Sequence, residues 1–436
     1  MQNILLAILP VIWPKMPPIG LGYLETYLLD KGIDVEIWDL NNLFYNLSDD
    51  NLKKQWLISS NVPFESSILE IIKKNHAKQY NAAINRLLNF EVVGFSCFKS
   101  NFSATCEIVK ILKSKRQDIK IILGGPEITR QFLKSHGGFD DNLNRLVDLF
   151  VVGEGELPLY NFMKGKKYAG KIARFEQLAD LSSLSFPRYQ GLDFSVYPRN
   201  DAVALQFSRG CVRKCNFCSE RLLYNNFRRR PAQSIIEEIK YHKKNNIKYF
   251  VFFDSLINAD ITALMDLCEK IIDNFGSVHW EAQIAIRRDM KQEVFEKMKK
   301  SGCYNLFVGL ESGCDNTLKN MNKGFTGSDA VGFFSQLKKA RLFFGVSVII
   351  GYPGETDSDF EENMEFFIRN KDIIPKIEQV NPFTYYDGTP ADRAADYKIN
   401  KNSLRRLEIF VRTIKEQGFK YTNAFLGNLM EKNDRI

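Results

Sequence analysis

The sequence predicts a two-part α/β protein: an open, doubly wound parallel sheet, followed by six βα units that form an incompletely closed barrel. Three observations favour this fold class. The chain has 436 residues, enough for two or three domains. Apolar runs alternate with helical patterns along both halves, and strands that are apolar on both faces are typical of covered parallel sheets. Hydrophobic residues make up 44% of the chain and charged residues 26%, as in globular proteins.

The first half, residues 1–165, is expected to fold as one domain. An open doubly wound sheet binds its ligand beyond the carboxyl ends of its strands, and glycine-rich segments follow several of these runs. The spacing alone is equally compatible with tight strand-to-helix turns. The expected strands are residues 3–9, 35–40, 92–96, 119–124 and 149–152, and the first helix covers residues 20–31.

The second half repeats the alternation with greater regularity. Residues 166–200 lack periodicity and contain Pro187 and Pro198, so they are expected to form a linker. Residues 201–390 form the predicted barrel, whose active site would lie at the carboxyl ends of its strands. Residues 391–436 are expected to form a short, charged helical tail. The six expected strands are residues 202–207, 249–253, 279–286, 305–310, 346–350 and 377–383.

Composition excludes several classes of protein. The net charge of +8 is spread over the whole chain, unlike the clustered basic face of nucleic-acid-binding proteins. The most apolar stretches are about ten residues long, half of what a bilayer requires, so no membrane span is expected. Eight cysteines form no regular disulfide pattern, and three of them lie within eight residues. This usage favours metal ligation in a reducing compartment, and we expect a cytoplasmic protein.

The strongest chemical signal is the segment SRGCVRKCNFCSE, directly after the first strand of the second half. Cys211, Cys215 and Cys218 have the spacing C-x3-C-x2-C. Structural zinc takes four ligands, and no fourth Cys or His lies nearby in the sequence. Cubane iron–sulfur clusters are held by thiolates, normally four, so three on one loop leave one iron open to another ligand. The five other cysteines are expected to be buried thiols: Cys97, Cys106, Cys268, Cys303 and Cys314.

This motif, at the end of the first strand of a βα series, resembles that of the radical S-adenosylmethionine enzymes. The resemblance implies a [4Fe-4S] cluster whose open iron chelates the amino and carboxylate groups of S-adenosylmethionine. It further implies that one electron from the cluster cleaves the sulfonium to methionine and a 5′-deoxyadenosyl radical, which abstracts a hydrogen atom. Phe217 matches the aromatic residue usual before the last cysteine.

Later strand ends match the same family in order: YFVFFDS, AIRRDM, LFVGLESG and VSVIIGYPGET. The resemblance implies contacts to the methionine amino group, the methionine carboxylate, the ribose and the adenine, in that order. An arginine suits the carboxylate because its planar fork binds in a bidentate manner. The implied contact residues are Asp254 and Ser255, then Arg287, then Glu311 and Ser312, then Gly351, Pro353, Gly354 and Glu355.

The first half resembles the Rossmann-like cobalamin-binding domain that precedes the radical domain in one class of these enzymes. Four segments carry this resemblance: PPIGLGYLETYLLDKGIDVEIWDL, VVGFSCFKSN, IKIILGGPEIT and LFVVGEGELPLYNFM. The D-x-H-x-x-G loop, whose histidine binds cobalt in many cobalamin proteins, is absent, which implies binding without a protein histidine ligand. The implied cobalamin contacts are Pro18, Gly20, Ser96, Gly124, Gly125, Gly153, Glu154 and Gly155.

Together these resemblances imply a cobalamin-dependent methyltransferase acting on an unactivated carbon. Rearrangement or cyclisation within the same class, or a radical enzyme with a vestigial first domain, are the alternatives. A tRNA methylthiotransferase would need three N-terminal cysteines for a second cluster, whereas only Cys97 and Cys106 are available. A non-enzymatic corrinoid or iron–sulfur module would not need the S-adenosylmethionine contacts.

The expected partners follow from the same chemistry. The substrate is a small molecule, lipid or peptide, and the electron donor is a protein such as flavodoxin or ferredoxin. The basic run Arg228, Arg229 and Arg230 is either a solvated stretch or a surface for an acidic substrate or electron donor.

Overall fold

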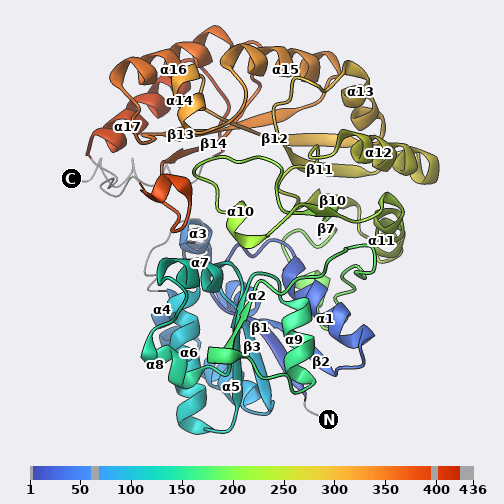
Figure 1. Ribbon diagram of the computed structural model, residues 1–436, viewed down its shortest axis with the longest axis vertical. Coiled ribbons are helices and arrows are strands. Elements are labelled where there is room, and N and C mark those ends of the chain that lie inside the picture. Colours follow the sequence, from blue (N-terminus) through green and yellow to red (C-terminus); the bar gives the residue numbers. More distant parts are fainter. Residues whose placement is uncertain (1–2, 60–67, 394–400, 423–436) are drawn as a thin grey trace. The chain divides into compact units, whose positions relative to one another are not determined.

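The computed structural model describes residues 3–59, 68–393 and 401–422. The chain divides into two compact units: Met1–Ala204 with Leu222–Asn225, and Leu205–Arg221 with Asn226–Ile436. Both have the α/β architecture expected from the sequence (Figure 1).

The first unit is built on a six-stranded parallel sheet of order β2-β1-β3-β4-β5-β6. Five strands lie where the apolar runs predicted them, and β6 is an additional edge strand within the segment expected to be a linker. The strands are β1 (Ile4–Ile8), β2 (Val35–Asp39), β3 (Val92–Ser96), β4 (Lys120–Gly124), β5 (Leu149–Val152) and β6 (Ile172–Arg174).

Helices cover both faces of this sheet, as its two separate cores show (Figure 1). On β1, Leu5 and Ala7 belong to one core, whereas Ile4, Leu6 and Ile8 belong to the other. Strands therefore have to be apolar at consecutive positions, which is the pattern that the sequence displayed. The helices are α1 (Ile19–Asp30), α2 (Leu40–Leu47), α3 (Asp50–Ser59), α4 (Ile68–Asn75), α5 (Ala77–Leu87), α6 (Phe102–Lys115), α7 (Pro126–Lys134), α8 (Asp141–Leu146) and α9 (Glu156–Met163).

Buried carboxylates attach the segment after β6 to this unit. The Glu25 side chain on α1 accepts hydrogen bonds from the backbone N–H groups of Gln190 and Gly191. Asp39 accepts one from the Tyr197 hydroxyl at 2.8 Å and one from the Asn42 N–H at 2.7 Å. Two carboxylates thus fix a segment that has no regular structure over most of its length.

The stability of the first unit should depend on the protonation of Asp39. Burial raises the pKa of this carboxyl from 3.8 to about 6. A raised pKa means that the folded chain favours the protonated form, so stability falls as pH rises through this window. Asp39→Asn keeps the shape without the charge, and its stability relative to wild type should be higher at pH 7.5 than at pH 5 by about 1.4 kcal/mol. Thermal unfolding of both proteins at the two pH values measures this, and a difference that is independent of pH contradicts it.

The second unit contains a six-stranded sheet of order β14-β13-β12-β11-β10-β7, in which β10 to β14 pair in parallel. Its order follows the chain and ends at β7 and β14, so it is an open barrel of the kind that was predicted. The strands are β7 (Ala202–Leu205), β10 (Tyr249–Phe252), β11 (His279–Ile284), β12 (Cys303–Glu311), β13 (Phe344–Ile350) and β14 (Ile377–Pro382).

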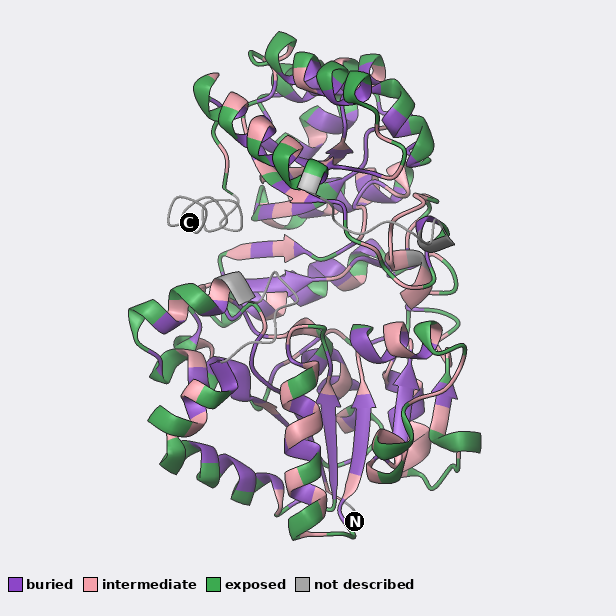
Figure 2. Cartoon of the chain, turned by 90° about the vertical axis from the view of Figure 1, so that its left-hand side faces the viewer, coloured by how far each residue is buried: buried purple, intermediate pink, exposed green. Residues whose placement is uncertain are grey.

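A short antiparallel pair, β8 (Ser208–Arg209) and β9 (Arg228–Arg229), brackets the cysteine motif. In both units most strand residues are buried or half-buried, and the helices expose one face (Figure 2). The helices are α10 (Glu220–Leu223), α11 (Ala232–Lys244), α12 (Ile261–Phe275), α13 (Gln292–Lys300), α14 (Asp315–Asn320), α15 (Gly327–Lys339), α16 (Asp357–Arg369) and α17 (Lys401–Glu416).

The described part of the predicted tail is largely α17, and its remaining residues, 394–400 and 423–436, lie outside the described residues. Leu407, Phe410, Val411 and Ile414 form the buried face of this helix. No helix within the described ranges is long and apolar enough to cross a membrane.

Candidate functional site

The cluster loop, residues 210–219, lies between β8 and α10 and carries all three motif cysteines, each half-buried as a free thiol. It starts at Gly210, whose φ of +84° favours glycine. A Cβ there would lie 2.6 Å from the carbonyl oxygen of Asn226. The loop therefore passes close to the chain that returns toward β9.

Asp254 holds the base of the loop. Its carboxylate follows β10, is 0% exposed, and accepts hydrogen bonds from the Ser208 hydroxyl at 2.5 Å and the Phe207 N–H at 3.0 Å. Burial raises the pKa of Asp254 to about 6. The structure thus uses Asp254 to position the loop, and not as an exposed ligand contact.

The spacing of the three motif thiols differs from that of a single tetrahedral metal site. In a tetrahedral zinc site, thiolates 2.3 Å from the metal stand roughly 3.8 Å apart. Among the described residues, the three motif sulfur atoms do not all lie within 4.8 Å of one another. Ligands of a cubane bind separate iron atoms and stand further apart. Burial raises the pKa of Cys218 to about 12, and that of Cys211 is also raised, so metal is needed to hold these groups as thiolates.

One group does bring three ligand atoms within 4.8 Å in the described residues: Cys314, Asp359 and Glu362. Asp359 is already used, because it caps α16 with Thr356 and accepts hydrogen bonds from Asn316. We assign no metal to this group.

At the end of β12, Glu311 adopts φ +73°, which is strained for a residue with a side chain. The pairing between β12 and β13 shifts register immediately before it. Its carboxylate pairs with Lys323 Nζ at 3.4 Å. The Lys323 ammonium lies 5.7 Å from the centre of the Phe217 ring and 5.6 Å from that of Phe325. The Glu311 side chain is 13% exposed and the Lys323 side chain 9%. A nearly buried cation therefore lies beside Phe217, the residue that precedes Cys218.

The predicted contacts Ser255 and Ser312 have partners within the protein. The Ser255 hydroxyl donates to Glu220 Oε2 at 2.6 Å, just after the cluster loop. Ser312 is 0% exposed, and its hydroxyl accepts from the Cys314 N–H at 3.1 Å. Ser312 therefore supports the turn after β12.

Arg287 also has other partners. Its fork binds Asp289 in a bidentate manner at 2.8 and 2.5 Å, and Nη1 donates to the carbonyl oxygens of Asn258 and Ala259, both at 2.9 Å. Four hydrogen bonds of one guanidinium are thus made within the chain, and they organise the turn after β11.

The predicted adenine loop, residues 351–355, is braced from the tail. Gly351 has φ +75°, and its N–H donates to Glu355 Oε2 at 2.9 Å. Arg406 of α17 donates to the same carboxylate oxygen at 3.1 Å. The Glu355 side chain is 1% exposed, whereas Pro353 is half-buried and Gly354 is exposed. Glu355 therefore shapes the loop, and Pro353 and Gly354 form its accessible part.

In the first unit, the predicted cobalamin residues follow strands β1, β3, β4 and β5. Ser96 and Gly124 are register partners at neighbouring strand ends. A Cβ on Gly125 would lie 2.8 Å from the Cys97 carbonyl, and one on Gly155 would lie 2.9 Å from Leu24. Close packing within the chain is enough to require glycine at these two positions. This agrees with the alternative interpretation, in which the glycines only form tight strand-to-helix turns.

The remaining positions of this set differ in exposure. Gly20 is exposed, with nothing within 4 Å of its Cβ position, and Glu154 is 7% exposed. Pro18 is half-buried at the start of α1, and Gly153 is half-buried with φ +93°. Trp13 and Phe98, each 37% exposed, follow β1 and β3 and were not predicted. Both rings thus follow the carboxyl ends of neighbouring strands and are partly open to solvent.

The basic run after the cluster loop is mostly internal. Arg230 is 1% exposed and pairs at 2.5 Å with Glu238, which is 0% exposed. Arg228 is 7% exposed, and Arg229 alone is open, paired with Asp260. The run was predicted to be either a solvated stretch or a surface for an acidic substrate or electron donor. Both predictions are wrong for Arg228 and Arg230, because these buried side chains brace β9 and α11.

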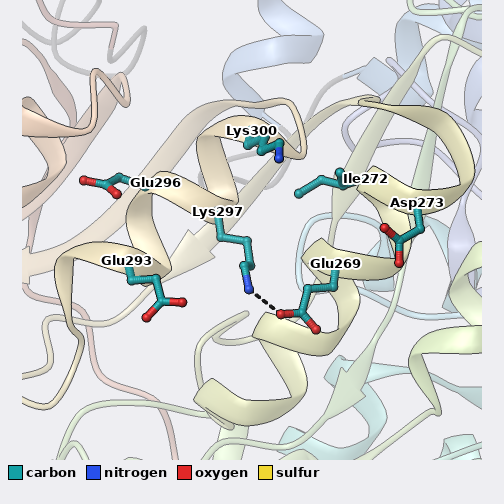
Figure 3. Close-up of a pocket in the computed structure, with 7 residues that line it drawn as sticks. All are labelled: Glu269, Ile272, Asp273, Glu293, Glu296, Lys297 and Lys300. Carbon is teal, nitrogen blue, oxygen red and sulfur yellow. Dashed lines mark hydrogen bonds and ion pairs between the residues drawn. The ribbon is translucent and has the colours of Figure 1, made fainter.

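A surface hollow of about 330 Å³ lies between α12 and α13 (Figure 3). Its walls are charged, with a Lys297–Glu269 ion pair across it, and it contains no residue of the strand ends. We assign it no part in the chemistry.

Sequence reasoning missed Lys323, Asn322 and Arg406. Lys323 and Asn322 lie in the run NMNKG, which begins with the last residue of α14, and an Asn- and Gly-containing turn was its signal in the sequence. The role of Arg406 depends on α17 packing against the barrel, which the sequence does not encode locally. Of the other cysteines, four are buried as expected and Cys106 is half-buried.

Residues 205–367 match the model of the radical SAM superfamily. The chain is 26% identical over 424 aligned residues to an uncharacterized methyltransferase of Pyrococcus horikoshii, and the match covers 91% of this chain and 82% of that protein. It is 23% identical to a threonylcarbamoyladenosine tRNA methylthiotransferase of Thermotoga maritima, over 73% of this chain and 72% of that protein.

Two solved structures share the fold of both units. The radical S-adenosylmethionine methyltransferase TsrM from Kitasatospora setae, with cobalamin and a [4Fe-4S] cluster bound, has a TM-score of 0.69 at 17% identity and covers 90% of this chain and 77% of its own. The cobalamin-dependent enzyme OxsB has a TM-score of 0.65 at 15% identity and covers 95% of this chain. This chain spans 56% of the length of OxsB.

Proposed function

We propose that this protein is a cobalamin-dependent radical S-adenosylmethionine methyltransferase that acts on an unactivated carbon. The observation that carries the proposal is the combination, in one chain, of a three-cysteine loop in an open barrel with an open parallel sheet whose strand ends expose aromatic rings. The likeness in fold to TsrM and OxsB over both units supports it.

In the barrel, Cys211, Cys215 and Cys218 would hold the [4Fe-4S] cluster. When bound, the reduced cluster supplies one electron to S-adenosylmethionine, which is cleaved to methionine and a 5′-deoxyadenosyl radical. The chain's contribution is to position the thiolates, bind the ligand and exclude water. Glu311 would accept from the ribose hydroxyls, and Pro353 and Gly354 would contact the adenine.

We assign the methionine carboxylate to Lys323 in place of Arg287. Arg287 already makes four hydrogen bonds within the chain, whereas the Lys323 ammonium makes one long contact at 3.4 Å. A nearly buried ammonium with donors to spare stabilises an anion well. Lys323 also lies beside Phe217, next to the last cysteine.

Lys323→Met is expected to weaken S-adenosylmethionine binding about tenfold or more, because a charge-assisted hydrogen bond contributes roughly 1.5–3 kcal/mol. Equilibrium dialysis of the reconstituted protein measures the affinity. Lys319→Met is the matched control, since Lys319 is exposed on α14, four residues earlier. Equal affinities for wild type and Lys323→Met would show that Lys323 does not bind the methionine carboxylate.

The first unit would bind cobalamin beyond the ends of β1, β3, β4 and β5, with Trp13 and Phe98 against the corrin. When bound as methylcobalamin, this cofactor supplies the methyl group. None of the loops that follow these strands, residues 9–18, 97–101, 125 and 153–155, contains a histidine, so no imidazole ligand to cobalt is available from them.

Equilibrium dialysis against hydroxocobalamin tests this part of the proposal. About one corrinoid should be retained per chain, and the electron paramagnetic resonance spectrum of its Co(II) state should lack nitrogen superhyperfine splitting. Trp13→Ala should weaken retention, whereas Phe343→Ala, which replaces an exposed aromatic residue of the second unit, should not. Failure of wild type to retain corrinoid would leave a radical enzyme with a vestigial first domain.

A methylthiotransferase is the second candidate, because such enzymes are among the relatives. The first unit offers Cys97 and Cys106 for a further cluster, one fewer than required, and Cys97 is 0% exposed. Rearrangement or cyclisation within the cobalamin class is distinguished by its product. We further propose a flavodoxin- or ferredoxin-type donor, a small-molecule, lipid or peptide substrate, and a reducing compartment such as the cytoplasm, which suits eight free thiols.

A further inference from the structure

We infer that residues 320–324, the sequence NMNKG at the end of α14, position the cluster loop. We call this segment the clasp. The inference rests on the proposed cluster, and its spectroscopic test also rests on S-adenosylmethionine binding, but both are independent of cobalamin and methyl transfer.

The clasp holds the interval between Cys215 and Cys218 through Asn216. The Asn216 backbone N–H donates to the Met321 carbonyl oxygen at 3.0 Å. Its side-chain Nδ2 donates to the Asn320 carbonyl oxygen at 2.8 Å. Both donors of one loop residue thus bind consecutive carbonyls of the clasp.

The clasp also holds the interval between Cys211 and Cys215. Asn322 Nδ2 donates to the Lys214 carbonyl oxygen at 2.8 Å, and Arg213 Nη1 donates to the Lys323 carbonyl oxygen at 3.3 Å. Arg213 Nη2 continues to the Ile286 carbonyl oxygen after β11, at 2.6 Å. Each interval between cysteines is therefore fixed by two hydrogen bonds to the clasp.

The clasp is itself rigid enough to act as a template. Asn322 has φ +56° and Gly324 has φ +72°, the left-handed conformations that end a helix. The Lys323 N–H closes this turn onto the Leu318 carbonyl at 3.0 Å. Met321 is 0% exposed and packs in a core with Phe217, Tyr352 and Phe383. A loop that has little regular structure of its own is thus held by an anchored turn.

This arrangement has a chemical purpose. Hydrogen bonds around the loop would orient the three thiolates, and such outer contacts raise the affinity of a metal site. Asn320, Met321 and Asn322 of the clasp would therefore be positioning residues, since they act through the loop and not on the iron. Lys323 belongs to the same turn, so the ligand's anion and the cluster loop share one support.

Asn322→Gly tests the inference with little backbone cost, because glycine readily adopts the left-handed conformation. The change removes only the hydrogen bond to Lys214. Asn246→Gly is the matched control: Asn246 is exposed after α11, has φ +64°, and lies outside the clasp. The measurement is the anaerobic rate at which reconstituted protein loses iron to a chelator, with the unfolding midpoint measured alongside.

Asn322→Gly should lose iron about fivefold faster than wild type, the factor that corresponds to the net worth of one hydrogen bond. Asn246→Gly should behave as wild type, and the two variants should unfold at the same midpoint. The change that S-adenosylmethionine causes in the paramagnetic resonance spectrum of the reduced cluster should also be altered in Asn322→Gly only. A wild-type rate in Asn322→Gly, or equal acceleration in both variants, would overturn the inference.

If Asn322→Gly also lowers the unfolding midpoint, faster iron loss could come from reduced stability, and a second variant is then needed. Arg213→Gln changes the loop and leaves the clasp intact, but removes the bonds to the Lys323 and Ile286 carbonyls. It should accelerate iron loss and alter the spectrum in the same direction. Wild-type behaviour of Arg213→Gln would then count against a positioning role for the clasp.

Discussion

Replacing Cys211, Cys215 and Cys218 together with alanine is expected to reduce the cluster content of the reconstituted protein to background and to abolish formation of 5′-deoxyadenosine. Each thiolate is one of three protein ligands, and the described residues offer no other cysteine in the loop. Even Cys211→Ala alone should leave a labile cluster, because two thiolates cannot hold a cubane securely. Iron and sulfide analysis after anaerobic desalting measures the effect.

The matched control for the single variant is Cys106→Ala. Cys106 is also half-buried and free, but it lies on α6 of the first unit. Its replacement should leave the iron content unchanged. A triple variant that retained close to four irons per chain would contradict the assignment of the cluster.

Arg230→Met is expected to destabilise the protein by roughly 3–5 kcal/mol, the cost of leaving a buried charge without its partner. Arg230 and Glu238 form a pair at 2.5 Å, and both side chains are almost fully buried. Burial raises the pKa of Glu238, and the charge of Arg230 is the first influence that opposes the rise. Arg230 also donates to the Gln206 carbonyl at the base of the cluster loop. Chemical denaturation measures the change in unfolding free energy.

Two controls isolate the buried charge. Arg229→Met removes an exposed pair with Asp260 one residue away and should cost about 1 kcal/mol or less. The double variant Arg230→Met with Glu238→Leu removes both charges and should recover much of the loss, as apolar replacements of buried pairs often do. A single Arg230→Met variant no less stable than Arg229→Met would show that the pair contributes little.

The fold was predictable because its signals are local. Buried strands such as β1 and β5 are uninterrupted apolar runs, and the alternation with helices defines a parallel sheet. The cysteine motif was equally local, since all three ligands lie on one loop. The short edge strand β6 carried no such signal, because it has only three residues, one of them exposed.

The functions of individual polar residues were less predictable, because they depend on contacts between distant segments. Asp254 and Arg287 stand at the expected strand ends, but each is occupied by neighbouring backbone groups. Glu355 is held by Arg406 from α17, 51 residues away. Arg230 belongs to a basic run that predicted a solvated side chain, yet it pairs with Glu238 in the helix that follows, α11. A strand end predicts where a side chain lies, whereas its partners require the three-dimensional structure.

The most direct test of the proposed chemistry is the fate of S-adenosylmethionine on the reduced protein. Reconstituted protein, reduced with dithionite and supplied with S-adenosylmethionine, should form 5′-deoxyadenosine and methionine in equal amounts, as chromatography can measure. The triple cysteine variant, treated identically, should form neither. Absence of 5′-deoxyadenosine from protein that carries a full complement of iron and sulfide, with and without cell extract as a source of substrate, would contradict radical chemistry in this protein.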